Sequence, residues 1–521
     1  MLVAPGIVER CTPKRISGWV APAGDANPDV LIKVNGLEVA RTVASKPTRH
    51  DGVIRNYGFS RVIGELWKYL GPQDAVTFEC GGETLPIAGY GFTYFHGEGA
   101  ESKFDELAEA VGKGYIFDKK GHLGVPLHKR GRWLRLFFSV YAKLRQELIE
   151  KFGYEPFVAY GTLLGAIRQG DFLNHDNDVD LVYISKHTDP VQVRIEYVAI
   201  CRHLIDLGYR GLLTKHGFAI KSPVRVDLNF AWFNPQGMFQ ASFGYHGPEL
   251  KFSRDFGRMK RARLGKYRVR VPRNSEAILE HLYGPGWKVP DPGFSHYSRS
   301  RKFDRSYWAT VEELASTFWR QYYMHQSEIG PPSRFAQQAL GAWNGKRCVV
   351  DLGCGGGADT QEFARQGHTA FGIDIEPAAI ALATRQASLQ DVGNCTFVAA
   401  DAASARDCGP PLDQALGHGE KIAVFGRCFF SSISEGTEES VMKMLVQKLE
   451  HFDLAIEVVA DRPTALPELT EPPYHRKIDE TRLIEKLQQI YGLTIKSVQR
   501  GTATALYKNE EFESTQILAG R

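Results

Sequence analysis

Residues 161–184 read GTLLGAIRQGDFLNHDNDVDLVYI and place Asp176, Asp178 and Asp180 at alternate positions directly ahead of an apolar run. In a β-strand, side chains two residues apart point to the same face, so we expect the carboxylates of Asp178 and Asp180 to lie roughly 6–7 Å apart on one strand. Asp227 lies in a second strand-like run, VRVDLNF. Carboxylate oxygens are ligands that Mg²⁺ and Mn²⁺ accept, and a cation would relieve their mutual repulsion. We therefore predict that Asp178, Asp180 and Asp227 hold Mg²⁺ or Mn²⁺.

The residues ahead of these aspartates predict a phosphate site. Gly161 and Thr162 open a helical stretch that ends near Arg168. A helix N-terminus reached through glycine is a natural place for a phosphate group. We expect Gly161, Thr162, Arg168 and Asp176 to contact the donor molecule. A metal ion beside a diphosphate implies phosphoryl or nucleotidyl transfer.

The acidic stretch has two other interpretations. A calcium loop of the EF-hand type that began at Asp176 would need Gly at its sixth position and Glu at its twelfth, where this chain has Leu181 and His187. That interpretation fails. A solvated acidic turn is the second alternative, although the run VDLVYI continues directly into a predicted buried strand.

Three stretches in order, GTLLGAIRQGDFLNHDNDVDLVYI, VRVDLNF and LEHLYGPGWKVPDP, resemble the motifs of the LicD/fukutin family over about residues 130–295. Members of that family move a phosphorylated alcohol from a cytidine diphosphate donor onto a glycan. The resemblance implies that Asp178, Asp180 and Asp227 are the metal and catalytic aspartates. His175 stands where many relatives carry Trp, and Asn177 stands where they often carry Asp.

The segment 251–273 is strongly basic, with ten Lys or Arg residues against one Asp. A solvated basic face is the simplest interpretation. The functional alternatives are a rim that binds the donor diphosphate, an anionic lipid-linked acceptor or a membrane surface. The aromatic residues expected for base stacking are few here, so we expect no nucleic-acid partner.

Residues 347–383 predict a strand, a glycine-rich turn, a helix and a second strand. Gly353, Gly355 and Gly357 would let the backbone approach a ligand at the helix N-terminus. This spacing alone also fits a nicotinamide-binding Rossmann domain, which we keep as an alternative. Asp351, two residues before the first glycine, suits a ligand with a cationic amino acid end better than a pyrophosphate.

This stretch resembles the first motif of class I S-adenosylmethionine-dependent methyltransferases. The resemblance implies that Asp374 binds the ribose hydroxyls and that Asp401 lies near the adenine. The methyl acceptor is open: methylation of a hydroxyl generally needs a base, for which His475 is the candidate, whereas a phosphate acceptor would favour Arg427 as a positioning group.

The order of these patterns predicts a multidomain chain of 521 residues. Alternating runs with Asn-Gly and Gly-Gly turns predict a small antiparallel β-sandwich of accessory role over 1–105. A central α+β nucleotidyltransferase-like domain follows over 106–305. An α/β Rossmann-like methyltransferase domain is expected over 312–521.

The composition predicts a cytoplasmic protein with reduced cysteines, since neither a signal sequence nor an apolar run long enough to span a membrane is visible. Peripheral association with the inner face of the membrane is one option.

The leading hypothesis is a bifunctional glycan-modifying enzyme. Its donor would be linked to cytidine diphosphate (phosphocholine, or ribitol or glycerol phosphate), and its acceptor would be a surface polysaccharide or lipid-linked glycan. The second activity would methylate the added group, its phosphate or an adjacent sugar. The alternatives are an RNA-modifying nucleotidyltransferase and methyltransferase, and a chain in which one domain is an inactive binding module.

Overall fold

The computed structural model describes the following residues of the chain. They are 5–21, 28–50, 53–96, 101–174, 176, 178–222, 224–242, 245–290, 305–464, 466, 475–505 and 510–521. The chain divides into two compact units. The first comprises 1–200, 209–211 and 216–307, and the second comprises 201–208, 212–215 and 308–521.

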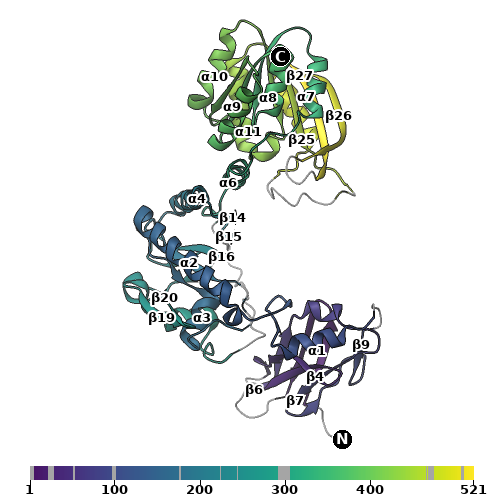
Figure 1. Cartoon of the computed structure of the whole chain (residues 1–521), viewed down its shortest axis with the longest axis vertical. Helices are drawn as coiled ribbons and strands as arrows, with labels where there is room; N and C mark the ends of the chain where they lie inside the picture. Colours follow the sequence, from purple (N-terminus) through teal and green to yellow (C-terminus); the bar gives the residue numbers. More distant parts are fainter. Residues whose placement is uncertain are drawn as a thin grey trace. The chain divides into compact units, whose positions relative to one another are not determined.

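Two antiparallel sheets form the N-terminal part of the first unit (Figure 1). One has the strand order β1-β2-β6-β5, and the other β4-β3-β7-β8 with β9 paired to β7. The strands are β1 (Gly6–Thr12), β2 (Arg15–Val20), β3 (Asp29–Val34), β4 (Leu37–Val43), β5 (Lys46–His50), β6 (Val53–Arg61), β7 (Ala75–Cys80), β8 (Glu83–Thr84) and β9 (Tyr94–Phe95).

These two sheets share one hydrophobic core. Strands β2 and β3 alternate buried and partly exposed residues, which is the pattern of a sheet with one buried face. Ile16 of one sheet and Phe78 of the other belong to the same buried cluster. Helix α1 (Phe104–Gly112) and the two-stranded hairpin of β10 (Ile116–Phe117) and β11 (Leu123–Gly124) add Leu107 and Phe117 to it. The predicted antiparallel β region is present, while its assignment as a sandwich stays a prediction.

The central part of the first unit contains a mixed sheet with helices beside it. The sheet has the order β12-β13-β16-β15-β14, with β17 and β18 added at β16. Its strands are β12 (Phe157–Val158), β13 (Asp180–Ile184), β14 (Arg210–Leu213), β15 (Phe218–Ser222), β16 (Val226–Phe233), β17 (Phe239–Ala241) and β18 (Tyr245–Gly247). The helices are α2 (Gly131–Glu147), α3 (Tyr160–Arg168), α4 (Pro190–Asp206) and α5 (Ser275–Tyr283), and a separate hairpin is formed by β19 (Lys260–Leu264) and β20 (Tyr267–Val271).

The register of this sheet positions the first candidate site. Strands β13 and β16 are parallel neighbours, and Asp180 lies directly beside Asp227. The remaining residues of β13 and β16 are almost all apolar and buried, so these strands are fixed in the sheet from both faces. The two aspartates therefore lie side by side at the N-terminal ends of β13 and β16, although 46 residues separate them in the sequence.

A seven-stranded sheet dominates the second unit, in the order β23-β22-β21-β24-β25-β27-β26. All neighbouring pairs are parallel except those that involve β27. The strands are β21 (Arg347–Leu352), β22 (Thr369–Asp374), β23 (Cys395–Ala399), β24 (Lys421–Arg427), β25 (Phe452–Val459), β26 (Thr494–Thr504) and β27 (Glu511–Gly520). The helices are α6 (Val311–Tyr323), α7 (Arg334–Ala342), α8 (Ala358–Arg365), α9 (Pro377–Leu389), α10 (Ala405–Gly417), α11 (Glu435–Lys448) and α12 (Glu480–Glu485).

Helices cover both faces of this sheet. Successive residues of a strand point to opposite faces, so that neighbouring residues pack against different helices. Val349 of β21 packs in a cluster with residues of α7 and α8, whereas its neighbour Val350 belongs to a larger cluster with residues of α10, α11 and α12. The predicted α/β Rossmann-like architecture of the C-terminal region is confirmed.

All eight cysteines are free thiols. Within the described ranges, no helix combines the length and the apolar character that a membrane crossing requires.

Candidate functional site

The first site is an acidic cluster, which we define as Asp176, Asp178, Asp180 and Asp227. Asp180 is the first residue of β13, so Asp178 lies in a bend two residues ahead of the strand. The expected pair on one strand face is therefore not formed: Asp178 reaches the cluster from a loop. The neighbouring departures from the family pattern, His175 and Asn177, lie outside the described residues.

Two cationic side chains contact this cluster, and neither was among the predicted site residues. Lys119 Nζ lies 2.8 Å from Asp178 Oδ1 and 3.4 Å from Asp176 Oδ1. Arg225 Nη2 lies 3.6 Å from Asp227 Oδ2 and 3.8 Å from Asp178 Oδ2. Arg168 and Lys120 also act on the cluster electrostatically, the first on Asp176 and the second on Asp227.

Burial, together with repulsion between neighbouring carboxylates, raises the pKa values of three members of the cluster. Burial raises the pKa of Asp176 to about 6, against the opposing effect of Lys119. Burial and the Asp178 carboxylate raise the pKa of Asp180 well above its usual range. The pKa of Asp227 is also raised, chiefly by burial, and its Oδ1 atom is buried without a hydrogen-bond partner among the described residues. Such perturbed carboxyl groups are typical of functional sites.

The residues predicted to bind phosphate lie beside this cluster. A Cβ atom on Gly161 would come within 2.7 Å of Asp176 Oδ2, so glycine is needed where this carboxylate approaches α3. The hydroxyl of Thr162 accepts a hydrogen bond of 3.1 Å from the backbone N–H of Asp180. Arg168 Nη1 donates to the carbonyl of Trp287 at 3.2 Å. Their contact with a donor phosphate stays a prediction.

Carboxylate oxygens are suitable ligands for a hard divalent cation, but the carboxylates of the cluster are not arranged as a set of metal ligands. Within the described parts of the chain, no group of three or more His, Cys, Asp or Glu residues is placed to hold a metal ion. Lys119 and Arg225 instead lie against the oxygens that a cation would use. The predicted Mg²⁺ or Mn²⁺ is therefore part of the proposal below.

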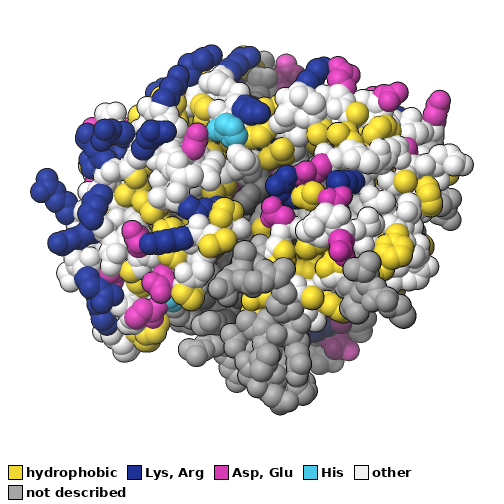
Figure 2. Space-filling view, turned by 90° about the horizontal axis from the view of Figure 1, so that it is seen from below, with side chains coloured by type: hydrophobic (Ala, Val, Ile, Leu, Met, Phe, Trp, Pro, Cys, Tyr) yellow, Lys and Arg dark blue, Asp and Glu magenta, His cyan; other side chains and the backbone are white. Residues whose placement is uncertain are grey.

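The basic segment 251–273 is largely exposed. Its hairpin β19–β20 carries the exposed residues Lys260, Arg261, Arg263, Lys266 and Arg268. Arg270 forms an ion pair with Glu155, with 2.9 Å between Nε and Oε1. Figure 2 shows Lys and Arg side chains gathered along one side of the visible face, while both charge signs mix elsewhere.

The second site is a cavity of about 340 Å³ in the second unit. It lies where β21, β22 and β24 end, which is where α/β sheets bind ligands. Asp351, Asp374 and Asp401 all line it. Asp351 is buried and accepts a hydrogen bond of 2.6 Å from the Thr360 hydroxyl, and burial raises its pKa well above the usual range.

The glycine-rich turn forms one wall of this cavity. Gly353 and Gly355 line it with φ angles of 69° and 53°, which only glycine adopts readily. The N–H of Gly355 donates to Asp374 Oδ2 at 2.9 Å, and the N–H of Glu376 donates to Asp374 Oδ1 at 2.9 Å. Burial raises the pKa of Asp374 to about 6. Gly357 is the residue that precedes α8 and has a φ of 80°, and its contact with a ligand stays a prediction.

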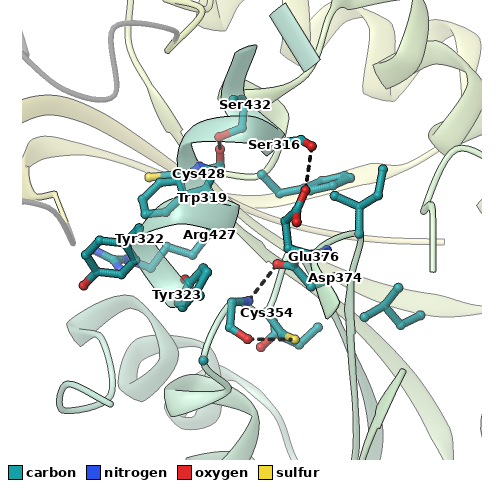
Figure 3. A pocket seen from close by; sticks show the side chains of 18 of the residues that line it. Ser316, Trp319, Tyr322, Tyr323, Cys354, Asp374, Glu376, Arg427, Cys428 and Ser432 are labelled. Atoms are coloured by element: carbon teal, nitrogen blue, oxygen red, sulfur yellow. Dashed lines mark hydrogen bonds between the residues drawn. The ribbon is translucent and has the colours of Figure 1, made fainter. Parts of the chain in front are cut away.

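An aromatic wall from α6 faces the glycine-rich turn and was missed in the sequence (Figure 3). It consists of Trp319, Tyr322 and Tyr323, and the hydroxyl of Tyr323 lies against Gly355. Helix α6 is held in place by Glu376, which accepts a hydrogen bond of 2.6 Å from Ser316. The aromatic residues of FWRQYY were a visible signal, but helical spacing alone does not distinguish a binding wall from core packing.

The two candidate residues for the methyl acceptor also line this cavity. Arg427 is bound by Glu457 at 3.1 Å and donates to the carbonyl of Thr504 at 2.7 Å, so much of its hydrogen-bonding capacity is already used. Burial lowers the pKa of His475 to about 4, and its Nδ1 atom has no hydrogen-bond partner among the described residues. The imidazole is therefore neutral at pH 7, the form that can accept a proton.

Two regions of the chain match known family models. Residues 153–274 match "LicD/FKTN/FKRP, nucleotidyltransferase domain", which includes the whole acidic cluster. Residues 345–408 match "Methyltransferase domain", which includes the glycine-rich turn, Asp374 and Asp401. The predicted combination of a LicD-type region with a methyltransferase domain is thereby confirmed.

Curated relatives match the chain over part of their own length. The 2-heptyl-1-hydroxyquinolin-4(1H)-one methyltransferase of Mycobacteroides abscessus is 28% identical over 24% of this chain and 55% of that enzyme. The ubiquinone biosynthesis O-methyltransferase of Acinetobacter baumannii is 33% identical over 17% of this chain and 38% of that enzyme. A solved structure, magnesium protoporphyrin IX methyltransferase from Synechocystis PCC 6803 with bound SAH, is 18% identical, covers 41% of this chain and 88% of its own, and has a TM-score of 0.28.

Proposed function

We propose that the protein is a bifunctional glycan-modifying enzyme. Its LicD-type region transfers a phospho-alcohol from a cytidine diphosphate-linked donor to a glycan or lipid-linked oligosaccharide. Its methyltransferase domain then methylates the added group, its phosphate or an adjacent sugar, with S-adenosylmethionine as the methyl donor. Tethering the two activities favours consecutive steps on one acceptor, because it raises their effective concentration.

One observation carries this proposal: each region that matches a family model brings its own carboxylates together at the ends of neighbouring parallel strands. In the first, Asp180 and Asp227 meet across two parallel strands. In the second, Asp351 and Asp374 lie at the ends of two others, in a cavity with a glycine wall. The two groups belong to different compact units, which supports two separate activities.

In the transferase site, Asp178, Asp180 and Asp227 are the residues that would hold a divalent cation. That cation would supply charge neutralisation for the donor diphosphate. The carboxylate oxygens of the cluster and the unpartnered Oδ1 atom of Asp227 fit this role. An acceptor hydroxyl would form the new P–O bond as cytidine monophosphate leaves, and a carboxylate of the cluster that does not bind the cation would accept the hydroxyl proton.

In the methyltransferase site, the chain binds and orients the methyl donor. S-Adenosylmethionine, when bound, supplies an electrophilic methyl group. The Asp374 carboxylate is oriented by two backbone N–H groups and retains lone pairs for the ribose hydroxyls. Asp351 is the candidate partner of the donor's ammonium group. Neutral His475 is the candidate base if the methyl acceptor is a hydroxyl.

The test uses the full chain with Mn²⁺, a panel of cytidine diphosphate-linked donors and a candidate glycan, with mass spectrometry of the product. We expect Asp178→Asn to abolish transfer of the phospho-alcohol and to leave the affinity for S-adenosylmethionine unchanged in calorimetry. The reciprocal variant, Asp374→Asn, should lose methylation and keep transfer. Retained transfer in Asp178→Asn would contradict the assignment of the acidic cluster.

A further inference from the structure

Lys119 is carried by a part of the chain that the family match does not include. The LicD-type match begins at residue 153, whereas Lys119 lies in the turn of the β10–β11 hairpin. It is 57 and 59 residues away from the two aspartates that it contacts. Its ammonium group lies 2.8 Å from Asp178 Oδ1 and 3.4 Å from Asp176 Oδ1. A lysine side chain is ordinarily charged at neutral pH.

The hairpin that carries Lys119 is fixed to the N-terminal β region. Arg61 donates a hydrogen bond of 2.7 Å to the carbonyl of Phe117, whose side chain is buried in the core of that region. Glu65 accepts a hydrogen bond of 2.7 Å from the N–H of Leu123, and its own N–H donates to the carbonyl of Gly121 at 3.0 Å. These bonds hold both ends of the turn, so the lysine is presented by a supported loop.

The turn itself is also ordered from within. Asp118 accepts hydrogen bonds from the N–H groups of Lys120 and His122 at 2.8 and 3.0 Å. A Cβ atom on Gly121, whose φ is +85°, would lie 2.5 Å from the nitrogen of Gly64. The close approach of the turn to the β region therefore requires glycine at this position. The backbone on either side of Lys119 is fixed before any ligand binds.

The position of the ammonium group conflicts with a metal ion at the same carboxylates. A Mg²⁺ ion would lie about 2.1 Å from a carboxylate oxygen. If it bound Asp178 Oδ1, it would lie within about 5 Å of Lys119 Nζ, which is 2.8 Å from that oxygen. Two cations so close repel each other strongly at a partly buried site. An ammonium group and a metal ion at the same carboxylate would therefore weaken each other's binding.

We propose that Lys119 is a residue of the transferase site, supplied by the N-terminal β region, and that a divalent cation and the Lys119 ammonium group compete for Asp176 and Asp178. The inference rests on the proposed metal-dependent transfer. It explains why the acidic cluster forms no metal cage in the described residues: the lysine balances part of its charge. It also gives the accessory β region a direct role in this site.

The first test measures Mn²⁺ binding to the full chain by electron paramagnetic resonance at low ionic strength. Lys119→Met removes the competing charge and keeps an unbranched side chain. We expect it to bind Mn²⁺ at least about tenfold more tightly than the wild type, since hydrogen bonds to charged groups are worth a factor of this order. Lys103→Met is the matched control, because Lys103 is an exposed lysine in the first unit away from the cluster. It should bind Mn²⁺ as the wild type does.

The second test measures lysine acetylation in the wild type, residue by residue, by mass spectrometry. Without metal, Lys119 should react more slowly than Lys103, and added Mn²⁺ should accelerate its reaction. Equal rates without metal, or Mn²⁺ binding that is unchanged or weaker in Lys119→Met, would overturn the inference. If Lys119→Met binds Mn²⁺ more tightly but the wild type turns over no donor of the panel, the proposed function fails, while the competition between Lys119 and the metal ion is supported. If Mn²⁺-dependent transfer is found with equal Mn²⁺ affinities, the inference alone fails.

Discussion

Replacement of Gly355 by Ala tests the contact on which the second site depends. Gly355 has a φ of +53°, and a Cβ atom there would lie 2.1 Å from the hydroxyl oxygen of Tyr323. The N–H of Gly355 also orients the Asp374 carboxylate. A methyl group must therefore move the α6 tyrosine, the turn or both.

The size of the effect can be separated into two parts with a control. Gly345 also has a positive φ, +77°, but a Cβ atom there would have nothing within 4 Å of it. In Gly345→Ala, the free energy of unfolding should fall only by the conformational cost of a positive φ, about 1–2 kcal/mol. Gly355→Ala adds an overpacking cost of about 1–3 kcal/mol. For a unit of this size, the extra cost lowers the midpoint of unfolding by about 2–4 °C for each kcal/mol.

The assay is scanning calorimetry of the full chain, with the affinity for S-adenosylmethionine measured by titration calorimetry. We expect Gly355→Ala to lower the unfolding midpoint further than Gly345→Ala does, and to lose affinity for S-adenosylmethionine, which Gly345→Ala keeps. Adding Tyr323→Phe removes the clashing oxygen and should restore part of the stability. Equal losses in the two alanine variants, together with unchanged binding, would refute the close packing of α6 on the turn.

Three further predictions concern charge. Because the pKa of Asp374 is raised to about 6, the affinity for S-adenosylmethionine should fall as the pH is lowered through 6 in titration calorimetry, and Asp374→Asn should show weak binding at every pH. Burial would raise the pKa of Glu312, but hydrogen bonds from Ser434 and Thr437 lower it to about 2. The ionised Glu312 carboxylate therefore stabilises the fold above pH 4.5, and this contribution is lost as the pH falls to 2. In urea unfolding, Glu312→Gln should be less stable than the wild type at pH 7, and the two free energies of unfolding should converge near pH 2. Filter binding at two salt concentrations should detect no tight RNA complex; RNA binding that weakens with salt and is lost in Arg261→Glu would instead favour the RNA-modifying alternative.

The sequence predicted the features that local patterns determine. The apolar runs around Asp180 and Asp227 indicated buried strands, and these strands are parallel neighbours in register. The strand, glycine turn and helix around Gly353 and Gly355 also form as expected, because alternation and glycine spacing reflect the backbone directly. The expectation that Asp178 shares the strand with Asp180 was wrong, since the strand begins later.

The features that the sequence did not predict depend on distant contacts. Lys119 looked like any lysine in a polar turn, and only the folded chain brings it to Asp178, 59 residues away. Arg225 pairs with Asp227, only two residues away, but its second contact, with Asp178 at 3.8 Å, depends on the loop that carries Asp178. The aromatic wall of α6 faces the glycine turn because Glu376 and Ser316 fix the helix, and helical periodicity contains no information on that partner.

The order of strands in the second unit has a consequence for its synthesis on the ribosome. Strand β27 is the last in the sequence, yet it lies between β25 and β26. Until it emerges, β25 has an open edge and β26 has no partner in the sheet. Domains generally fold as units and in order during synthesis. Most of the first unit can therefore be folded before β27 has been synthesised and can pair with β25 and β26. A nascent chain stalled before residue 511 would expose that open edge and should be the species most prone to aggregation.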